Sequence, residues 1–582
     1  MADTCAGDGA TTCSPPNNFF SMENRFFKYA ILQILFLAPL ATFFFYPLIW
    51  RTTGSLLGWY LRKKTDGRRC HILELVEADE KEYRESRSNS TSKSGGESGE
   101  DGEWEKVDAY TIGTSKNGDK GDRDEDWDGI VGFFHPFCNA GGGGERVLWA
   151  AIRATQQRWP RAKCVVYTGD HGVSKDAILS RVKNRFNIHL HPPTVNFLYL
   201  STRHWVLAST WPRFTLAGQS LGSLVLAWDA FSLLVPDIFV DTMGYAFALG
   251  LSKFLFGSAV PTGAYVHYPT ISTDMLDSLK PAAGGGGGGA APQGVNAGQG
   301  AGLRGKLKQA YWRLFARVYS RVGASADVVM TNSTWTQGHI QRLWGPLRKS
   351  RAAAGADIAV VYPPVAVSEL EHEVEVSRPS EAGREKVLLY IAQFRPEKNH
   401  QLILQSFADF LKKGGDAARD AKLVLVGSVR DDQDSKRVYQ LRLLVNELQI
   451  RDRVEFHLDA SWPEILDWLR RSSVGVNGMW NEHFGIGVVE YQAAGLVAVV
   501  HDSGGPKVDI VVDIEGEPTG FHATTTAEFA DGFEKALSLS DPYAVRQRAR
   551  QSAKRFTEEE FARRWTEQME KLVTTRMGKE RA

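Results

Sequence analysis

Apolar residues along most of the chain fall into short runs of three to six, separated by helical stretches. Such runs are typical of parallel strands that helices cover on both faces. There are two series: Ile130–His135, Lys163–Tyr167, Val195–Leu200, Ile238–Val240, Ala264–His267 and Asp327–Met330, then Val387–Ala392, Lys422–Val426, Arg453–Phe456, Val474–Val476 and Leu496–Val500. They predict an α/β fold with two Rossmann-like, doubly wound domains, residues 129–345 and residues 346–582, the second with a terminal helix. A ligand is expected in the crevice at the carboxyl ends of the strands.

One apolar run is long enough to cross a membrane. Tyr29–Trp50 contains 22 residues and no charge, which gives a helix of about 33 Å at 1.5 Å per residue. The alternative is a cleaved signal peptide, whose apolar region is shorter and ends in small residues. This run ends in the bulky segment Tyr46–Arg51, so we expect a transmembrane anchor at residues 29–50.

Basic residues around the anchor predict its orientation. Two cations precede the run and six follow it: Arg25 and Lys28, then Arg51, Arg62, Lys63, Lys64, Arg68 and Arg69. The positive-inside rule places the larger group in the cytosol. Residues 1–28 are then a lumenal tail, residues 51–76 are a basic juxtamembrane segment, and both Rossmann-like domains face the cytosol.

Two segments have the composition of flexible linkers. Residues 77–128 carry 17 acidic and 8 basic residues and few aliphatic ones. They cannot bury enough apolar area to offset the entropy of ordering, so we expect an acidic disordered tether. Residues 281–303 contain the run Gly284–Gly289 and are expected to form a flexible insertion.

Composition also argues against several classes of protein. The formal net charge is +1, which argues against nucleic acid as a partner. The five cysteines include no Cys-x-x-Cys pair, which argues against a zinc ribbon and a disulfide scaffold. No Asp-x-Asp pair stands at the end of a predicted strand, so we expect no metal.

Two further regions are more apolar than a soluble surface requires. Ser209–Pro261 contains three aspartates, which argues against a second membrane span. A buried core and a surface that enters the bilayer interface both fit this region, and Leu221–Val235 is the candidate for the second. The helix predicted at Lys306–Val322 has arginines along one face and apolar residues along another. We favour a solvated amphipathic helix there over a membrane-surface helix.

Glycine and charged residues follow the ends of several predicted strands. Gly141–Gly144 lies between a strand and a helix, where backbone N–H groups can approach an anion. Arg395 and Lys398 lie in the loop after the first strand of the second domain, where they could neutralise a diphosphate. Glu482 and Glu490 flank a predicted helix start, so one carboxylate can reach a sugar and the other a ribose. Each feature alone also fits an ordinary surface loop.

Together, these segments resemble one enzyme family. The segments are Phe134–Arg146, Val266–Ser272, Thr331–Thr336, Val361–Val365, Gln393–His400, Asn481–Glu490 and Ser503–Pro506. The set resembles retaining glycosyltransferases of the GT-B class (glycosyltransferase family 4), and among them the asparagine-linked glycosylation α-1,2-mannosyltransferases of the endoplasmic reticulum. The resemblance implies that mannose passes from GDP-mannose to a dolichol-linked oligosaccharide, as its fourth and fifth mannoses, on the cytosolic face of the membrane.

The resemblance also implies roles for single residues. The catalytic set would be Glu482 at the mannosyl ring, Arg395 and Lys398 on the diphosphate, and His267 from the first domain, while Glu490 would hold the ribose. The donor would also contact the glycine-containing segments: Gly142, Gly143, Gly144, Phe484, Gly485, Ile486 and Gly487. No cofactor besides the donor substrate is expected. The expected partners are the lipid acceptor, the endoplasmic reticulum membrane and other mannosyltransferases of the pathway.

A retaining reaction without an evident enzymic nucleophile suggests front-face displacement. The leaving diphosphate would take the proton of the acceptor hydroxyl, while Arg395 and Lys398 stabilise its growing charge. Two alternatives stay open. One is a membrane-bound transferase that uses another sugar nucleotide or lipid acceptor, and the other is a membrane scaffold without turnover. Convergent cations and carboxylates in one crevice count against the scaffold.

Overall fold

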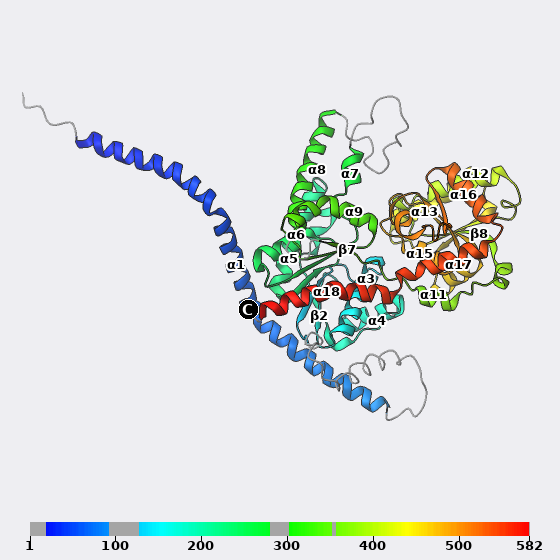
Figure 1. Cartoon of the computed structure of the whole chain (residues 1–582), viewed down its shortest axis with the longest axis horizontal. Helices are drawn as coiled ribbons and strands as arrows, with labels where there is room; N and C mark the ends of the chain where they lie inside the picture. Colours follow the sequence, from blue (N-terminus) through cyan, green and yellow to red (C-terminus); the bar gives the residue numbers. More distant parts are fainter. Residues whose placement is uncertain (1–18, 92–126, 280–301, 352–356, 581–582) are drawn as a thin grey trace, which may run out of the picture.

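The computed structural model describes residues 19–91, 127–279, 302–351 and 357–580, and in the first range it describes the side chains of residues 48–86 and 88. Two α/β domains lie next to each other, and a long N-terminal helix runs past the first and projects from it (Figure 1). Each domain contains one parallel sheet. The predicted architecture of two Rossmann-like domains is therefore confirmed. The predicted insertion at residues 281–303 lies almost entirely outside the described residues.

The N-terminal domain is built on a seven-stranded sheet of order β3-β2-β1-β4-β5-β6-β7. Its strands are β1 (Ile130–Phe134), β2 (Lys163–Thr168), β3 (Val195–Tyr199), β4 (Ile238–Asp241), β5 (Thr262–Val266), β6 (Val328–Thr331) and β7 (Ile358–Val360). The central strands β1, β4 and β5 are buried at every position, which explains their continuous apolar runs. The strand order reverses at β1, so the carboxyl end of β1 is the expected place for a ligand.

Helices cover both faces of this sheet. They are α3 (Gly143–Arg158), α4 (Lys175–Phe186), α5 (Thr215–Leu233), α6 (Ala246–Phe256), α7 (Thr273–Ser278), α8 (Gly302–Gly323), α9 (Thr334–Leu343) and α10 (Gly345–Arg351). One hydrophobic core joins the sheet to α5, α6 and α8, and a second joins it to α3 and α4.

The C-terminal domain repeats this plan with a six-stranded sheet of order β10-β9-β8-β11-β12-β13. Its strands are β8 (Glu385–Ile391), β9 (Lys422–Gly427), β10 (Val454–Leu458), β11 (Ser472–Asn477), β12 (Val497–His501) and β13 (Gly520–Ala523). Its helices are α11 (Val367–Glu373), α12 (His400–Lys413), α13 (Asp432–Glu447), α14 (Trp462–Arg471), α15 (Ile486–Ala493), α16 (Thr526–Leu537) and α17 (Pro542–Ala553).

The chain crosses between the domains at both ends of the C-terminal domain, and both crossings differ from the predicted boundary. Strand β7 pairs with β6, so the N-terminal sheet extends to Val360 rather than ending at residue 345. The last helix, α18 (Glu558–Glu580), packs on the N-terminal domain, where Trp565 is fully buried in the core around α3. Its apolar side complements that core, so the terminal helix was assigned to the wrong domain.

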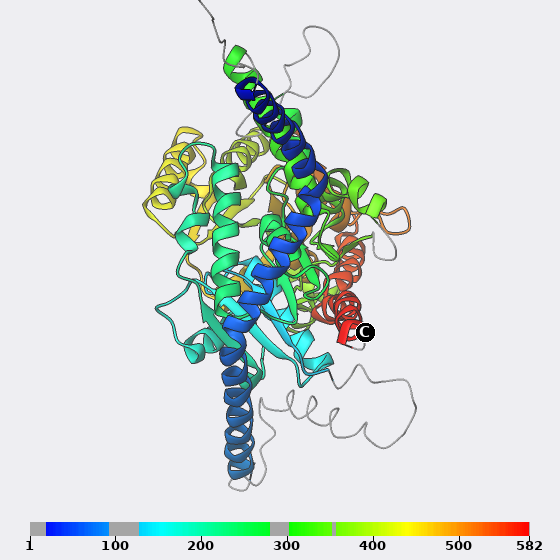
Figure 2. The same cartoon turned by 90° about the vertical axis from the view of Figure 1, so that its left-hand side faces the viewer.

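The N-terminal helix α1 (Phe19–Thr91) corrects the predicted linkers. Figure 2 shows it crossing the N-terminal domain. Its buried face contains Gly54, Gly58, Leu61, Ile72 and Val76. A Cβ at Gly58 would lie 2.0 Å from the backbone oxygen of Leu255 in α6, so only glycine permits this close crossing. Residues 51–76 are thus a docked part of the domain, and the segment from residue 77 to Thr91 is helical rather than a disordered tether.

A buried ion cluster fixes α1 to the domain. Arg69 Nη2 lies 2.6 Å from Asp237 Oδ2, and Arg576 Nη2 of α18 lies 2.9 Å from Asp237 Oδ1. Burial opposes ionisation, but the two arginines and the Ile130 N–H outweigh it and lower the pKa of Asp237. The cluster therefore joins three segments that are far apart in the sequence.

The predicted anchor is not tested here. Among the helices whose residues are described, none has a stretch long and apolar enough to cross a bilayer. The side chains of residues 29–47, which make up most of that segment, lie outside the described ones.

The two apolar regions turn out to be core on one side and exposed on the other. In α5 and the residues after it, Phe231 and Leu234 are fully buried, whereas Leu221 is 57% exposed and Trp228 is 38% exposed. Helix α8 buries Trp312, Phe315 and Tyr319 but exposes Leu307, Leu314 and Val318. Helix α8 also exposes Arg313, Arg317 and Arg321 beside these apolar residues, so the choice of a solvated helix over a membrane-surface helix stays a prediction.

Candidate active site

A cavity of about 720 Å³ lies between the domains, at the carboxyl ends of both sheets. Loops after β1, β8 and β9 line it, together with the start of α15. The lining includes these predicted residues: Gly142, Gly143, Gly144, His267, Lys398, Glu482, Phe484, Gly485, Ile486, Gly487 and Glu490. Arg395 is the one predicted site residue that does not line it. The structure thus brings nearly the whole predicted set together, while the role of each residue stays a prediction.

The N-termini of two helices meet across this cavity. Helix α3 begins at Gly143 and α15 begins at Ile486. A Cβ at Gly143 would lie 2.9 Å from Ile486 Cδ1, so glycine lets the two helix ends approach each other. Unpaired N–H groups and the helix dipole favour an anion at each end. Not every glycine-loop amide is open, because the Gly142 N–H donates to Glu145 Oε2 at 2.6 Å.

Glu482 and Lys398 form an ion pair on the floor of the cavity. Lys398 Nζ donates to Glu482 Oε2, and the Glu482 side chain is 14% exposed. Burial raises the pKa of Glu482, but the charge and hydrogen bond of Lys398 more than compensate and lower it overall. The carboxylate is therefore ionised at neutral pH and held by a cation.

The loop after β12 holds Glu482 in place. The Gly505 N–H donates to the Glu482 carbonyl at 2.8 Å, and the Asn481 N–H donates to Ser503 Oγ at 2.7 Å. Gly504 has φ +67°, and a Cβ there would lie 2.2 Å from the Glu482 carbonyl oxygen. This explains why two glycines follow Ser503: a side chain at Gly504 would collide with the Glu482 backbone, and one at Gly505 with the Phe484 backbone.

The cations of the site differ partly from those predicted. Arg395 Nη1 lies 3.7 Å from Glu397 Oε1, and the Arg395 side chain is 39% exposed. Arg430, which follows β9, lines the cavity instead, and so does Arg146 of α3. Burial, and then the charge of Arg395, lower the pKa of Arg430. Arg430 comes three residues after the end of β9, and a cation so soon after a strand was a signal that could have identified it.

Glu490 lies beside a part of the cavity that sequence reasoning missed. Burial raises the pKa of Glu490, the charge of Arg146 opposes this, and the charge of Glu369 adds to it. Glu369, Asp459 and Trp462 also line the cavity, and the Trp462 indole N–H donates to Glu369 Oε1 at 3.3 Å. Glu369 lies on α11 at the start of the C-terminal domain, and no local pattern marks it.

His267 is a neutral residue in this site. Its Nε2 lies 3.1 Å from the Thr242 carbonyl oxygen, which can only accept, so Nε2 carries the proton. Burial lowers the pKa of His267 to about 4. The side chain can therefore orient a substrate by a hydrogen bond, but it carries no charge near neutral pH.

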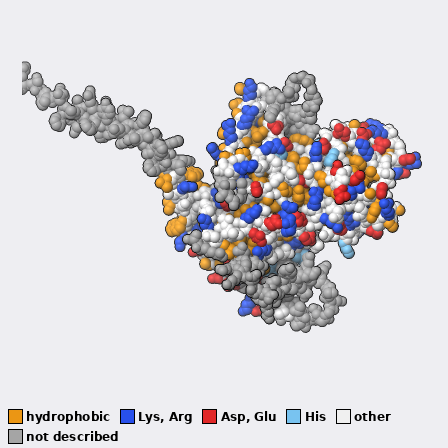
Figure 3. All heavy atoms as spheres, viewed as in Figure 1, with side chains coloured by type: hydrophobic (Ala, Val, Ile, Leu, Met, Phe, Trp, Pro, Cys, Tyr) orange, Lys and Arg blue, Asp and Glu red, His pale blue; other side chains and the backbone are white. Residues whose placement is uncertain are grey.

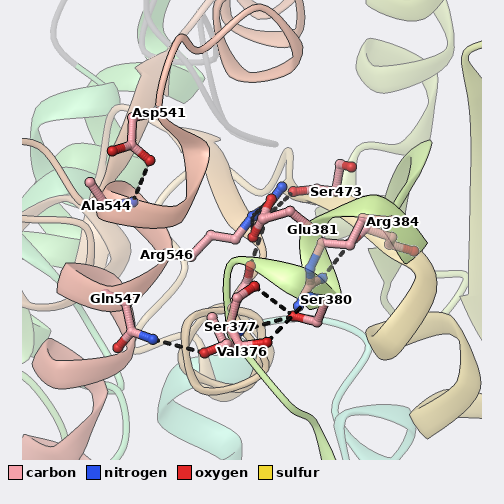
Figure 4. A network of polar contacts seen from close by, with 12 residues as sticks. Val376, Ser377, Ser380, Glu381, Arg384, Ser473, Asp541, Ala544, Arg546 and Gln547 are labelled. Carbon is pink, nitrogen blue, oxygen red and sulfur yellow. Dashed lines mark hydrogen bonds and ion pairs between the residues drawn. The ribbon is translucent and has the colours of Figure 1, made fainter.

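Arg546, which is buried, and Arg384, which is half-buried, hold the far end of α15, and Figure 4 shows both residues with Glu381. Arg546 of α17 pairs with Glu381 at 3.0 Å and donates to the carbonyls of Ser473 and Gly495 at 2.8 and 2.7 Å. Arg384 donates to the carbonyl of Ala494 at 2.8 Å. Ala494 and Gly495 directly follow α15, and Ser473 lies at the start of β11. The network therefore holds the C-terminal end of the helix whose N-terminus faces the cavity.

The acidic and histidine residues of the described chain do not form a metal site. No group of three or more His, Cys, Asp and Glu in the described ranges could hold a metal ion. Metal independence stays a prediction.

Two Rossmann-like domains that face each other across a crevice with helix N-termini, cations and carboxylates define a nucleotide-sugar-dependent glycosyltransferase of the GT-B class. Two family models match the chain, ALG11 mannosyltransferase N-terminus over residues 128–344 and Glycosyl transferases group 1 over residues 373–556. The chain belongs to the family of GDP-Man:Man(3)GlcNAc(2)-PP-Dol α-1,2-mannosyltransferases, as its relatives show.

The matches to relatives with this name extend over most of the chain. The protein of Neurospora crassa is 72% identical over 95% of this chain and 98% of its own length. The protein of Homo sapiens is 43% identical over 76% of this chain and 87% of its own length. Among solved structures, the trehalose 6-phosphate synthase of Burkholderia multivorans has a TM-score of 0.55 at 13% identity, covering 77% of this chain and 99% of that chain. At that identity the likeness shows the fold alone.

Proposed function

We propose that this chain transfers mannose from GDP-mannose, in α-1,2 linkage, to the dolichol-diphosphate-linked trimannosyl-chitobiose, and so adds the fourth and fifth mannoses. Family membership supports the substrates. The observation that carries the proposal is the crevice, which Lys398, Glu482 and Glu490 line together with the N-termini of α3 and α15. A scaffold has no physical need for a buried carboxylate held by a lysine in such a cavity.

We place the donor in the cavity in a single orientation. Its diphosphate lies between the two helix N-termini, near Lys398 and Arg430, where fixed dipoles and cations favour two negative charges. The mannosyl ring lies at Glu482 and the ribose at Glu490. The guanine lies towards Glu369 and Asp459, because its two adjacent N–H donors match a carboxylate, and Trp462 offers an apolar ring beside it.

The reaction balances without an added base. The bond between mannosyl C1 and the β-phosphate oxygen breaks, and a bond forms between C1 and the acceptor oxygen on the same face. The acceptor proton passes to the departing diphosphate, whose charge Lys398 and the helix N-termini stabilise. Glu482 is already paired with Lys398, so it stabilises positive charge on the ring rather than attacking C1. His267 in its neutral form accepts a hydrogen bond at Nδ1, because its Nε2 proton is donated to the Thr242 carbonyl.

The membrane arrangement is part of the proposal. The predicted anchor at residues 29–50 would hold the enzyme in the endoplasmic reticulum membrane with its crevice in the cytosol, where sugar nucleotides are made. The six cations after the anchor support this orientation.

One assay tests the function. Purified protein is incubated with GDP-mannose and a trimannosyl-chitobiosyl lipid diphosphate, and the products are read by mass and by the anomeric signals in NMR. Addition of two α-linked hexoses is expected. Transfer from another sugar nucleotide in preference, or no transfer by folded protein, would overturn the proposal, and a β-linked product would overturn retention.

A further inference from the structure

The N-terminal domain carries a second cavity that the reaction site does not use. It has a volume of about 460 Å³ and lies between the start of α5 and the first half of α8. Its apolar lining is Phe214, Leu216, Leu307, Tyr311 and Trp312, and its charged lining is Arg304 and Lys308. None of its lining residues lines the crevice between the domains. We call this cavity the α5–α8 groove.

The groove has defined walls. Tyr311 Oη accepts the Ala217 N–H at 3.0 Å, and the Tyr311 and Phe214 rings meet edge to face at 5.4 Å. Lys308 Nζ lies 4.9 Å from the centre of the Trp312 ring. These contacts fix the position of α8 against the start of α5, so the groove is part of the packed domain.

Phe214 is costly for the free protein. It has φ +53°, a left-handed conformation that is rare for a bulky residue, and it leaves 70% of its surface exposed. Leu307 beside it is 62% exposed. Strained backbone and exposed apolar side chains that lower stability are found where they serve binding.

The chemistry of the groove fits an anion with an apolar chain. Both charged lining residues are cations, and α8 has six cations and no acid in its sequence. An adjacent segment of this chain does not match the groove: residues 280–301 contain no acid and no leucine, isoleucine or aromatic residue. An isoprenyl chain ending in a diphosphate supplies both the apolar surface and the charge.

We propose that the α5–α8 groove binds the diphosphate and the first isoprene units of the lipid acceptor. This inference rests on the proposed function. Several sugars separate the diphosphate of that acceptor from the mannose that is extended, so its lipid end must be held away from the reaction crevice. The groove satisfies this requirement, since it lies outside the crevice and on the N-terminal domain, opposite the domain whose Lys398 and Glu482 would hold the donor.

The test compares two pairs of cations on one helix in the full-length protein in neutral detergent. The groove variant is Arg304→Ala/Lys308→Ala, and the matched control is Arg317→Ala/Arg321→Ala, which removes the same charge further along α8. The acceptor carries a C20 isoprenyl diphosphate. We expect the groove variant to raise its KM about tenfold or more, as for the loss of hydrogen bonds to a charged group. In the groove variant, the KM for GDP-mannose and the turnover with a lipid-free trimannosyl-chitobiose acceptor should not change.

The outcome is decided by the control and by a binding measurement. Equal effects of both variants, or no effect of either, would overturn the proposal. Direct binding of sugar-free C20 isoprenyl diphosphate, which needs no catalysis, should weaken in the groove variant alone. If phosphatidylserine competes equally well with this probe, the groove binds bulk lipid. If only an acidic peptide displaces the probe, the groove binds protein. Either result would overturn the proposal. Wild-type protein that binds this lipid but transfers no mannose would instead count against the proposed function.

Discussion

The two domains share one sheet order but differ in their outer surfaces. In the N-terminal domain, large apolar side chains are exposed on α1, α5 and α8, and Figure 3 shows apolar and basic side chains together along α8. The exposed set includes Leu56, Trp59, Leu221, Val225, Trp228, Leu307 and Leu314. In the C-terminal domain, the large exposed apolar residues are few among those described: Tyr439, Leu443, Leu458, Trp462 and Val508. Because the same architecture folds without such a surface, the fold does not require it, and we expect it to contact the membrane of the proposed function.

The buried ion clusters of the domains differ in what they connect. In the C-terminal domain, Glu381 and Arg546 join elements of one domain around α15. In the N-terminal domain, Asp237 joins α1 to the last helix of the chain through Arg69 and Arg576. Each cluster buries a charge that needs its partner. The first supports the donor site, while the second fixes the helix that leads toward the predicted anchor.

This difference bears on the proposed attachment to the membrane. The predicted anchor and the docked segment belong to one helix, α1. A flexible tether would leave orientation free, whereas a helix packed at Gly54 and Gly58 would restrain it. With the proposed anchor in the membrane, the N-terminal domain would be oriented by its own helix, and α5 and α8 lie on that domain.

The largest effect is expected at the donor half of the crevice. Lys398→Ala should reduce turnover roughly a hundredfold or more, because it removes a cation that stabilises the leaving diphosphate and holds Glu482. Turnover is measured by product mass, with thermal unfolding as the check on folding. Arg395→Ala is the matched comparison and should cost much less, since its side chain lies against Glu397 outside the cavity. Equal losses would mean that the sequence-based role of Arg395 is correct and that the loop moves when the donor binds.

The next effect concerns the docking of α1. Gly58→Leu should lower the free energy of unfolding of the N-terminal domain by about 1–3 kcal/mol, as for overpacking of a tight interface. The reason is the 2.0 Å approach of its Cβ position to the Leu255 carbonyl. Gly67→Leu on the same helix is the control, because nothing lies within 4 Å of its Cβ position. Denaturant unfolding followed by tryptophan fluorescence measures both, and a loss of the same size at Gly67 would contradict close docking as the cause.

A smaller effect separates the outer surfaces. The protein for this test is a shortened chain that begins at Leu48 and keeps the docked part of α1. The triple change Leu221→Ser/Val225→Ser/Trp228→Ser should weaken its binding to anionic vesicles about tenfold. Full burial of one such side chain stabilises by about 1.5–3 kcal/mol, and each substitution removes part of that free energy. Co-sedimentation measures the bound fraction.

The matched change on the other domain is Tyr439→Ser/Leu443→Ser, and binding should stay unchanged. Binding that neither change affects would show that α5 does not contact lipid. Phe231 and Leu234 are unsuitable for this test because both are core residues.

The strands were predictable because burial on both faces gives each a continuous apolar run. Most of the crevice was predictable too, because parallel strands bring the loops at their carboxyl ends together. Contacts made by distant segments were not. Glu369 reaches the site from α11 at the start of the C-terminal domain, and α18 returns to the first domain through the shape of a core that no local pattern encodes. The first part of the tether, up to Thr91, was wrongly assigned because its composition does not show that it continues a docked helix, in which Ile72 and Val76 are buried just before it.

The smallest effect is expected where that tether begins. Glu80 Oε1 lies 2.5 Å from His191 Nε2, so the helix is still attached to the domain at this point. Burial opposes ionisation, but the hydrogen bond and charge of His191, together with Arg84, lower the pKa of Glu80. A lowered pKa stabilises the fold above the ordinary carboxyl range, and this contribution is lost as pH falls through the lowered value. Glu80→Gln should therefore cost at most about 1 kcal/mol at neutral pH, and wild type and variant should converge in acid, in urea unfolding at several pH values. Deleting residues 92–121 should change neither the stability nor the turnover. A loss of stability in Glu80→Gln, with none in the deletion, would place the end of the docked helix between residue 80 and residue 92. A large loss of stability or turnover in the deletion would contradict this division.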